Sequence, residues 1–175
     1  MTPEPKRIIE ALLFAAGEPL SLQKIHEIVA SGHETTLKEI KQTIGNLQKE
    51  YADEGRAFRL EAIAEGFVLR THSDFAPFVR LLFSSRRNEK LSSASMEVLA
   101  IVAYKQPITK ASIERIRGVD SSGVLQHLAE RELIEVCGKA EACGRPSLYG
   151  TTKEFLKYFG LNKLDELPSQ DLALK

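Results

Sequence analysis

The chain has 175 residues, 43% of them hydrophobic and 27% charged, which is typical of one globular domain or two small ones. Its 24 basic and 24 acidic residues balance, which argues against a protein whose affinity comes mainly from phosphate contacts with nucleic acid. Two cysteines are too few for a disulfide scaffold, and the N-terminal residues, interrupted by Glu10, show neither a signal peptide nor a membrane span. We therefore expect a cytoplasmic protein.

The first 83 residues predict three helices, a β-hairpin and a closing helix. Thr36 and Glu39 form a capping box that opens the third helix. Alternating apolar residues at 58–64 and 67–71, joined by a Glu65–Gly66 turn, predict the hairpin with one buried face. The apolar positions at helical spacing are Ile8, Ile9, Leu12, Leu13 and Ala16, then Leu22, Ile25, Ile28 and Val29, then Leu37, Ile40, Ile44, Leu47 and Tyr51.

Residues 91–136 predict a second set of three helices that runs into a strand. The apolar run 98–104 fits a buried strand by periodicity alone, but a cap at Ser93 or Ser95 and the length of the segment favour a helix buried on more than one side. Gln106–Pro107 ends that helix. A short helix carrying Ile113 and Ile116 follows.

The end of the chain predicts a second hairpin and another closing helix. Gly118 ends the short helix, and Asp120 or Ser121 opens the next one. The wing then runs through the turn that Cys137 and Cys143 flank, and Thr151 with Glu154 is a capping box for the closing helix. We expect the two cysteines to be reduced thiols, since the cytosol is reducing.

The two halves repeat each other at an offset of 88 residues. Adding 88 to an apolar, capping or proline position in the first half gives its counterpart in the second, up to the wings, which differ in length. The pairs are Pro19 and Pro107, Leu20 and Ile108, Ser21 and Thr109, Ile25 and Ile113, Ile28 and Ile116, Leu37 and Leu125, and Ile40 and Leu128. Three short helices that run into a hairpin make the winged form of the helix-turn-helix.

The sequence therefore predicts a mainly α fold with small β-hairpins, an α+β fold of two tandem winged-helix domains joined by a short linker. We place the N-terminal domain at 1–84, the linker at 85–90, the C-terminal domain at 91–168 and a disordered tail at 169–175.

No pattern in the chain indicates catalysis. The four histidines lie on separate predicted elements, and there is no phosphate-binding glycine loop, zinc-binding helix motif or nucleophile elbow. We expect no enzyme activity, no cofactor and no metal.

DNA binding is the alternative that the winged-helix pattern leaves open. The third helix of such a fold often enters the major groove, but the segment 121–131 offers one firm positive charge, Arg131, against Glu130. A DNA-binding transcriptional regulator is therefore the second hypothesis. The helix 95–104 is apolar on more faces than a domain of about 80 residues covers, which indicates a domain or subunit contact, unless its own hairpin and closing helix enclose it.

The sequence resembles the ScpB family, segregation and condensation protein B, from about Pro5 to Pro168. The motifs that carry the resemblance are Ile9–Phe14 with Glu18–Leu20, Glu97–Tyr104 with Gln106–Thr109, Ile116–Ser121, Gly144–Pro146 with Leu148–Thr152, and Phe155–Leu156 with Phe159–Leu161. The resemblance implies a non-catalytic subunit that supports chromosome condensation and segregation in cell division. It also implies homodimerisation through the N-terminal domain, binding of the kleisin ScpA, and an indirect link through ScpA to the SMC ATPase.

The resemblance also suggests where this chain makes its contacts. We expect the C-terminal domain to bind the kleisin through Arg117, Val119 and Asp120, before the third helix, and through Arg145 and Pro146 on the second wing. A guanidinium can fork onto a carboxylate or onto backbone carbonyls, so Arg145 is the leading single candidate. For the dimer contact we expect Ile9, Leu13 and Leu20. We expect DNA contact to be weak or to occur only within the complex. We also expect the protein to associate with the nucleoid and to have no membrane partner.

Overall fold

The computed structural model describes residues 3–53, 55–82 and 90–168, which form two compact units, Met1–Arg87 (unit 1) and Asn88–Lys175 (unit 2). The predicted tail, 169–175, and all of the predicted linker, 85–90, except Lys90 lie outside the described residues.

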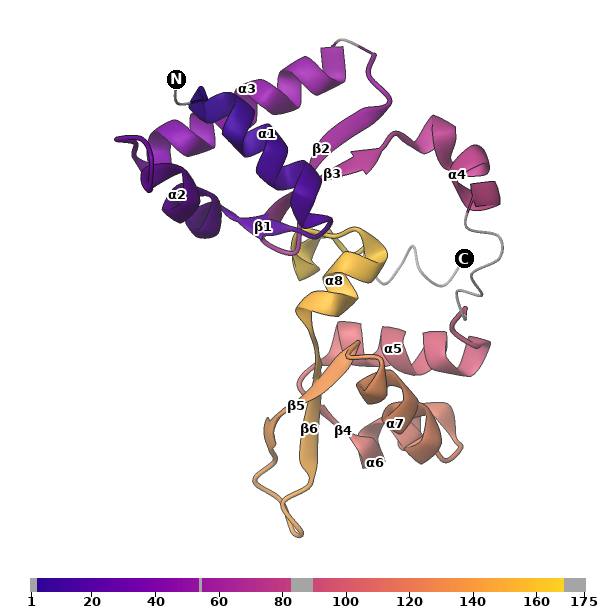
Figure 1. The fold of residues 1–175 in the computed structure, drawn as a ribbon. Helices are drawn as coiled ribbons and strands as arrows, with labels where there is room; N and C mark the ends of the chain where they lie inside the picture. The colour runs from indigo at the N-terminus through magenta and orange to yellow at the C-terminus, as the bar shows by residue number, and fades with distance from the viewer. Residues whose placement is uncertain (1–2, 54, 83–89, 169–175) are drawn as a thin grey trace. The chain divides into compact units, whose positions relative to one another are not determined.

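Unit 1 places three helices against a small antiparallel sheet of strand order β1-β3-β2 (Figure 1). Strand β1 lies between the first two helices in sequence and pairs with β3 through Leu20 and Phe67. Its elements are α1 (Pro5–Ala16), β1 (Leu20–Ser21), α2 (Leu22–Ala30), α3 (Leu37–Asp53), β2 (Phe58–Ile63), β3 (Gly66–Thr71), η1 (Ser73–Phe75) and α4 (Ala76–Leu82).

Local signals in the sequence fix these elements. The capping box at the start of α3 is present, because the Thr36 N–H donates to Glu39 Oε2 at 2.8 Å and the Glu39 N–H donates to Thr36 Oγ1 at 3.3 Å. The predicted hairpin is also confirmed, as β2 pairs with β3 from Phe58–Thr71 to Ile63–Gly66, but its turn is Ala64–Glu65, one residue before the predicted Glu65–Gly66. The core of unit 1 consists of Ile9, Leu13, Ile25, Val29, Ile40, Ile44, Leu47 and Leu60.

Unit 2 has the same order of elements and a sheet of order β4-β6-β5 (Figure 1). Its elements are α5 (Ser93–Lys105), β4 (Ile108–Thr109), α6 (Lys110–Arg117), α7 (Ser122–Glu130), β5 (Ile134–Lys139), β6 (Ser147–Thr151), α8 (Lys153–Phe159) and η2 (Leu164–Glu166). Helix, strand, two helices and a hairpin follow one another in both units, which is the winged-helix arrangement. The prediction of a mainly α fold with small hairpins is confirmed.

Two predicted caps lie one residue from their expected positions. The cap of α5 is Ser92, whose hydroxyl accepts from the Ser95 N–H at 3.1 Å, and Ser95 itself is buried. The cap of α8 is Thr152, whose hydroxyl accepts from the Phe155 N–H at 3.2 Å. Hydroxyl residues stand side by side at both starts, and tertiary packing decides which one takes the cap position.

Helix α5 forms the centre of unit 2. Its residues Val98, Leu99 and Val102 are buried with Ile134 of the hairpin and Phe155 of α8, so the unit's own hairpin and closing helix enclose most of its apolar surface. Met96 remains 41% exposed on the face toward α8. Within the described residues, no helix combines the length and apolar character needed to cross a bilayer.

Candidate functional site

The structure brings three of the five predicted partner-binding residues together. Arg117 ends α6, and Val119 and Asp120 form the turn between α6 and α7. Arg145 and Pro146 lie instead in the loop between β5 and β6, where Arg145 is exposed and the Ala140 N–H donates to the Pro146 carbonyl at 2.9 Å. Arg145 also has a φ of 41°, and its N–H donates to the Ala142 carbonyl at 2.8 Å.

The residues predicted for the dimer contact lie mostly inside unit 1. Ile9 and Leu13 are 0% and 1% exposed, and they pack against α2 and α3 in the core. Leu20 is half-buried at the edge of the same core. Helical spacing predicts that Ile9 and Leu13 share one apolar face of a helix, but it does not say whether that face meets the core or a second chain. In this structure that face meets the core.

The α6–α7 turn has a defined backbone. Gly118 adopts a φ of 74°, a left-handed conformation that glycine reaches without strain, and its N–H donates to the Glu114 carbonyl at 2.7 Å. The helix therefore ends at Arg117, and the chain reverses direction. Val119, the next residue, is 56% exposed.

The side chain of Arg117 holds this turn in place through contacts with α5 and with Ser121. Its side chain is only 7% exposed, and Nε donates to Glu97 Oε2 on α5 at 2.9 Å. Its Nη1 donates to the hydroxyl of Ser121, a residue that is 0% exposed, at 2.8 Å. The Ser121 N–H in turn donates to Glu114 Oε1 at 3.0 Å. Arg117 is thus part of the framework that joins α5, α6 and α7.

Asp120 is exposed, but neighbouring groups also occupy its carboxylate. The Ser122 hydroxyl and N–H donate to it at 2.8 and 3.2 Å, and Lys110 Nζ lies 3.6 Å away. The pKa of Asp120 is lowered from 3.8, mainly because the Ser122 hydroxyl donates to the charged form, with the Ser122 N–H and Lys110 adding to the effect. Lys110 Nζ also lies 3.4 Å from Glu114 Oε1 and donates to the Ser122 hydroxyl.

Beside these paired polar groups, two large apolar side chains stay exposed around the turn. Ile116 and Val119 are 54% and 56% exposed, and Val119 lines a shallow cleft of about 360 Å³. The residues that line this cleft are Glu114, Arg115, Gly118, Val119 and Asp120. Arg115 is exposed and forms no ion pair among the described residues. The site can therefore bind an apolar side chain and add one charge-assisted contact.

Ile116 is the site residue that the sequence did not reveal as exposed. Its spacing from Ile113 predicts that both face the core, yet Ile113 is 0% exposed and Ile116 is 54% exposed. Ile116 lies in the last turn of α6, two residues before Gly118 ends the helix. That position at the helix end was the available signal.

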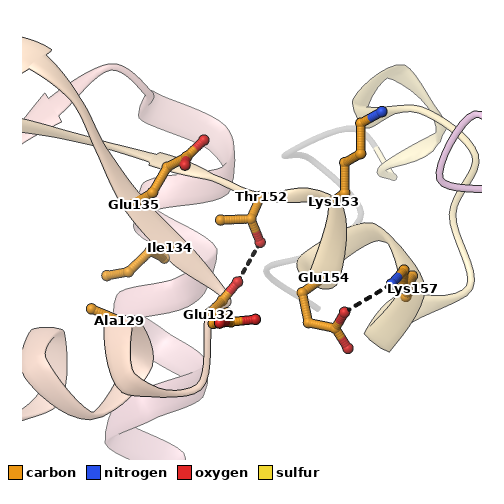
Figure 2. A pocket seen from close by; sticks show the side chains of 8 residues that line it. All are labelled: Ala129, Glu132, Ile134, Glu135, Thr152, Lys153, Glu154 and Lys157. Carbon is orange, nitrogen blue, oxygen red and sulfur yellow. Dashed lines mark hydrogen bonds and ion pairs between the residues drawn. The ribbon is translucent and has the colours of Figure 1, made fainter.

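A second and larger cleft, of about 450 Å³, lies between the end of α7, β5 and α8 (Figure 2). Glu154 and Lys157 pair along α8 at 3.3 Å, and the Thr152 hydroxyl donates to the Glu132 carbonyl (Figure 2). Both signs of charge line it, and the only hydroxyl points to a backbone carbonyl. The lining residues therefore do not form a nucleophile–base pair. They are Ala129, Glu132, Ile134, Glu135, Thr152, Lys153, Glu154 and Lys157.

The two cysteines and the possible metal ligands lie apart from one another in the described residues. Cys137 and Cys143 are free and exposed, and the Cys137 thiol donates to the Leu148 carbonyl at 3.4 Å. Among the residues that the structure describes, no three His, Cys, Asp or Glu side chains converge as metal ligands would.

Two of the side chains that would read DNA in the alternative hypothesis, on and just after the third helix of unit 2, contact neighbouring side chains. Gln126 Nε2 donates to Glu130 at 2.9 Å, and the guanidinium of Arg131 lies over the ring of Tyr158, 5.9 Å from its centroid. A base-reading helix presents such side chains to the groove.

The family model described as segregation and condensation complex subunit ScpB matches residues 7–170. The segregation and condensation protein B of Syntrophotalea carbinolica is 45% identical over 168 residues, which are 96% of this chain and 83% of that protein. Its namesake in Geobacillus thermodenitrificans is 48% identical over 164 residues, 93% of this chain and 77% of that protein.

Two solved structures are also similar. ScpB from Mycobacterium tuberculosis is 30% identical, with 90% of this chain and 96% of that chain covered and a TM-score of 0.43. A dimer of a ScpB N-terminal domain, crystallised in complex with an ScpA peptide, is 37% identical and covers 44% of this chain and 91% of that chain, with a TM-score of 0.40.

Proposed function

This chain belongs to the ScpB family of segregation and condensation complex subunits, and we propose that it is a non-catalytic accessory subunit that binds the kleisin ScpA. Through ScpA it joins the SMC ATPase indirectly and supports chromosome condensation and segregation in cell division. The protein acts as a homodimer in the cytoplasm, at the nucleoid. The family name of its relatives supports the complex and the process, and the surface of unit 2 supports the mode of binding.

The exposed apolar surface of the α6–α7 turn carries this proposal. Arg117 and Lys110 hold the turn in place with hydrogen bonds and ion pairs, so binding a partner there requires little ordering. Ile116 and Val119 then contribute apolar area, and Arg115 a positive charge, to a partner segment with an apolar and an acidic side chain. Such a surface fits a protein partner better than a phosphate backbone.

The two units have different roles in this proposal. Unit 1 forms the dimer and, by analogy with the related N-terminal domain that was crystallised with an ScpA peptide, takes part in kleisin binding. Unit 2 adds a second contact through Val119, Asp120 and the neighbouring surface of α6. Arg145 and Pro146, on the wing, extend that contact, whereas Arg117 acts by positioning the turn.

The transcriptional-regulator hypothesis has less support. Net charge is zero over the chain, Gln126 of α7 donates to Glu130, and Arg131, just after the helix, lies over the ring of Tyr158. Affinity for duplex DNA rises with each phosphate that a protein neutralises, and unit 2 concentrates no such charge on its third helix.

The test is titration calorimetry of the full chain with full-length ScpA from the same organism, in parallel with a labelled DNA duplex at two salt concentrations. We expect stoichiometric binding of ScpA and negligible duplex binding. A Val119→Asp variant is expected to lose affinity for ScpA by at least about tenfold, because it places a charge in an apolar contact.

Val136→Asp is the matched control, since Val136 is also a valine of unit 2 and is also 56% exposed, but it lies on β5. It is expected to bind ScpA within about twofold of the unmodified chain. Equal losses for both variants would remove the α6–α7 turn from the contact. Tight, salt-dependent duplex binding without ScpA binding would refute the proposed function.

A further inference from the structure

Residues 162–168, which follow α8 in unit 2, reach back to the central helix α5 and are called the strap below. Leu167 of the strap is half-buried and packs against the core of unit 2. The Tyr104 hydroxyl on α5 donates to the Pro168 carbonyl at 2.8 Å, which joins residues 64 positions apart in the sequence. The strap therefore covers apolar surface of α5 beyond that which the hairpin and α8 enclose.

The strap begins at a well-defined helix end. Gly160, at a φ of 68°, ends α8, and the Leu161 N–H donates to the Leu156 carbonyl at 2.9 Å. Leu161 is thus part of the helix cap, in the manner of a Schellman motif. The chain can pivot after Leu161 while α8 and its cap stay in place.

The strap also holds its own shape. The Leu167 N–H donates to the Leu164 carbonyl at 3.0 Å, and the Asn162 N–H donates to Glu166 Oε2 at 2.8 Å. These bonds join residues within the strap, so they do not have to break when the strap moves away from α5. What release has to break is the hydrogen bond from Tyr104 and the packing of Leu167.

The contact between the strap and α5 is loosely packed. An apolar cleft of about 260 Å³ lies between α5, α8 and the end of the strap, and Met96, Ala103, Phe159 and Leu167 are among its lining residues. Protein interiors are normally close-packed, with few voids larger than a water molecule. An empty volume beside Leu167 means that this side chain makes fewer contacts than a core leucine does.

The floor of the same cleft is packed much more tightly than its cover. Leu99 of α5 and Phe155 of α8 also line the cleft, and they are 1% and 2% exposed. Regions with few buried apolar contacts open at a lower free energy than the core does. The strap is therefore the part of this surface that opens first, and its release uncovers α5 while the core stays intact.

We propose that the strap is an autoinhibitory cover for α5. In the free chain Leu167 occupies the apolar face of that helix, and the strap is released without unfolding of unit 2. Release opens an apolar cleft that the chain otherwise fills with its own side chain, so the strap controls when α5 is accessible. This cleft shares no lining residue with the cleft at the α6–α7 turn, and the inference does not rest on ScpA binding.

Thiol labelling of the full chain measures this release. In a Cys137→Ser/Cys143→Ser chain, Ala103→Cys places a thiol in the cleft, where N-ethylmaleimide reaches it when the strap is released. We expect this thiol to react at least about tenfold more slowly than the exposed Cys143 of a Cys137→Ser chain. Equal rates would overturn the inference, because α5 would then be accessible without release of the strap.

Substitutions in the contact should change the labelling rate of Ala103→Cys in a definite order. Leu167→Ser is expected to raise the rate by on the order of 10-fold, and Tyr104→Phe, which removes one hydrogen bond and little packing, by about threefold to fivefold. Leu164→Ser is the matched control, since Leu164 lies in the strap but is 37% exposed, and it is expected to leave the rate within about twofold. Rates that neither Leu167→Ser nor Tyr104→Phe changes would overturn the inference.

Urea separates release of the strap from unfolding of unit 2. Release exposes little surface, so the labelling rate is expected to depend weakly on urea, whereas unfolding exposes the whole core and depends on urea steeply. A labelling rate that follows the unfolding of unit 2 at every urea concentration would overturn the inference. Circular dichroism verifies that the variants are folded, and Tyr104→Phe keeps the test decisive if Leu167→Ser unfolds.

Binding of anilinonaphthalene sulfonate, a dye that fluoresces on exposed apolar surface, gives a second readout without a new cysteine. The folded Leu167→Ser chain is expected to bind the dye several-fold more strongly than the unmodified chain, and Leu164→Ser is expected to bind it no more strongly. The same increase in both variants would show that the dye does not report the cleft below Leu167, and it would count against the strap as its cover.

Discussion

Arg117 offers the sharpest test of the distinction between a residue that holds the site and one that touches the partner. Its side chain is 7% exposed, joined to Glu97 and to the buried Ser121. We predict that Arg117→Ala destabilises unit 2 by about 3 kcal/mol. Glu97 is 54% exposed, so its ion pair contributes only about 0.5–1 kcal/mol of this. The remainder comes from the buried methylenes, at about 0.8 kcal/mol each, and from the lost hydrogen bond to Ser121.

Arg117→Met separates these contributions, because methionine fills the space of the methylenes but donates no hydrogen bond. We expect a loss of about 1–1.5 kcal/mol for this variant. Arg115→Ala, on the exposed side of the same helix, is the matched control and is expected to change stability by less than about 0.5 kcal/mol.

Tyrosine fluorescence during urea unfolding can follow unit 2 alone, since the chain has no tryptophan and three of its four tyrosines, Tyr104, Tyr149 and Tyr158, lie in unit 2. A Tyr51→Phe background removes the signal of unit 1. Separate signals matter, because two units need not unfold in one transition. Unchanged stability of Arg117→Ala combined with lost ScpA affinity would refute the assignment and return Arg117 to the contact surface.

Two further predictions concern unit 1. Gly66→Ala is expected to destabilise unit 1 by about 2 kcal/mol in urea unfolding, because the added Cβ would lie 2.9 Å from the Leu20 carbonyl oxygen. Gly45→Ala, in open space within α3, is expected to stabilise unit 1 by about 0.5–1 kcal/mol. Equal effects of the two substitutions would contradict this explanation. The pKa of Glu39 is lowered from 4.5 because the Thr36 N–H and hydroxyl donate to its carboxylate, so its contribution is complete above about pH 4.5 and disappears as the pH falls through the lower folded-state pKa. The stability difference between the unmodified chain and Glu39→Gln is therefore expected to shrink between pH 6 and pH 3, and a constant difference would argue against the capping box as its source.

Sequence patterns predicted the order of elements because the signals for them are local. The alternating apolar residues predicted β2 and β3, with a turn one residue later than the observed Ala64–Glu65, and the Thr36–Glu39 box begins α3 as expected. The caps of α5 and α8 were less predictable, since neighbouring hydroxyl residues are equivalent in sequence and only packing selects Ser92 and Thr152.

The direction in which an apolar helix face points could not be predicted. Helical spacing placed Ile9, Leu13, Ile113 and Ile116 on stripes, but it does not say what covers each stripe. The structure encloses the first three and leaves Ile116 54% exposed. The contacts of polar groups at the α6–α7 turn could not be predicted either, because the hydrogen bond from Arg117 to Glu97 joins residues 20 positions apart in the sequence.

The internal repeat makes the exposed positions more informative than they would be in a single domain. Ile25 and Ile113 are both 0% exposed, and Ser21 and Thr109 both cap the helix that follows, so these pairs share one role in the fold. Ile116 departs from this agreement, since its counterpart Ile28 is half-buried.

The closing helices differ in the same sense, as α8 packs through Phe155 and α4 leaves Phe78 and its neighbours exposed. Burying a side chain of this size contributes about 1.5–3 kcal/mol. Unit 2 shows that this fold can bury such a side chain from its closing helix. The exposed Ile116 and the exposed α4 are departures from the repeat, and they mark apolar side chains that the core of their own unit does not use.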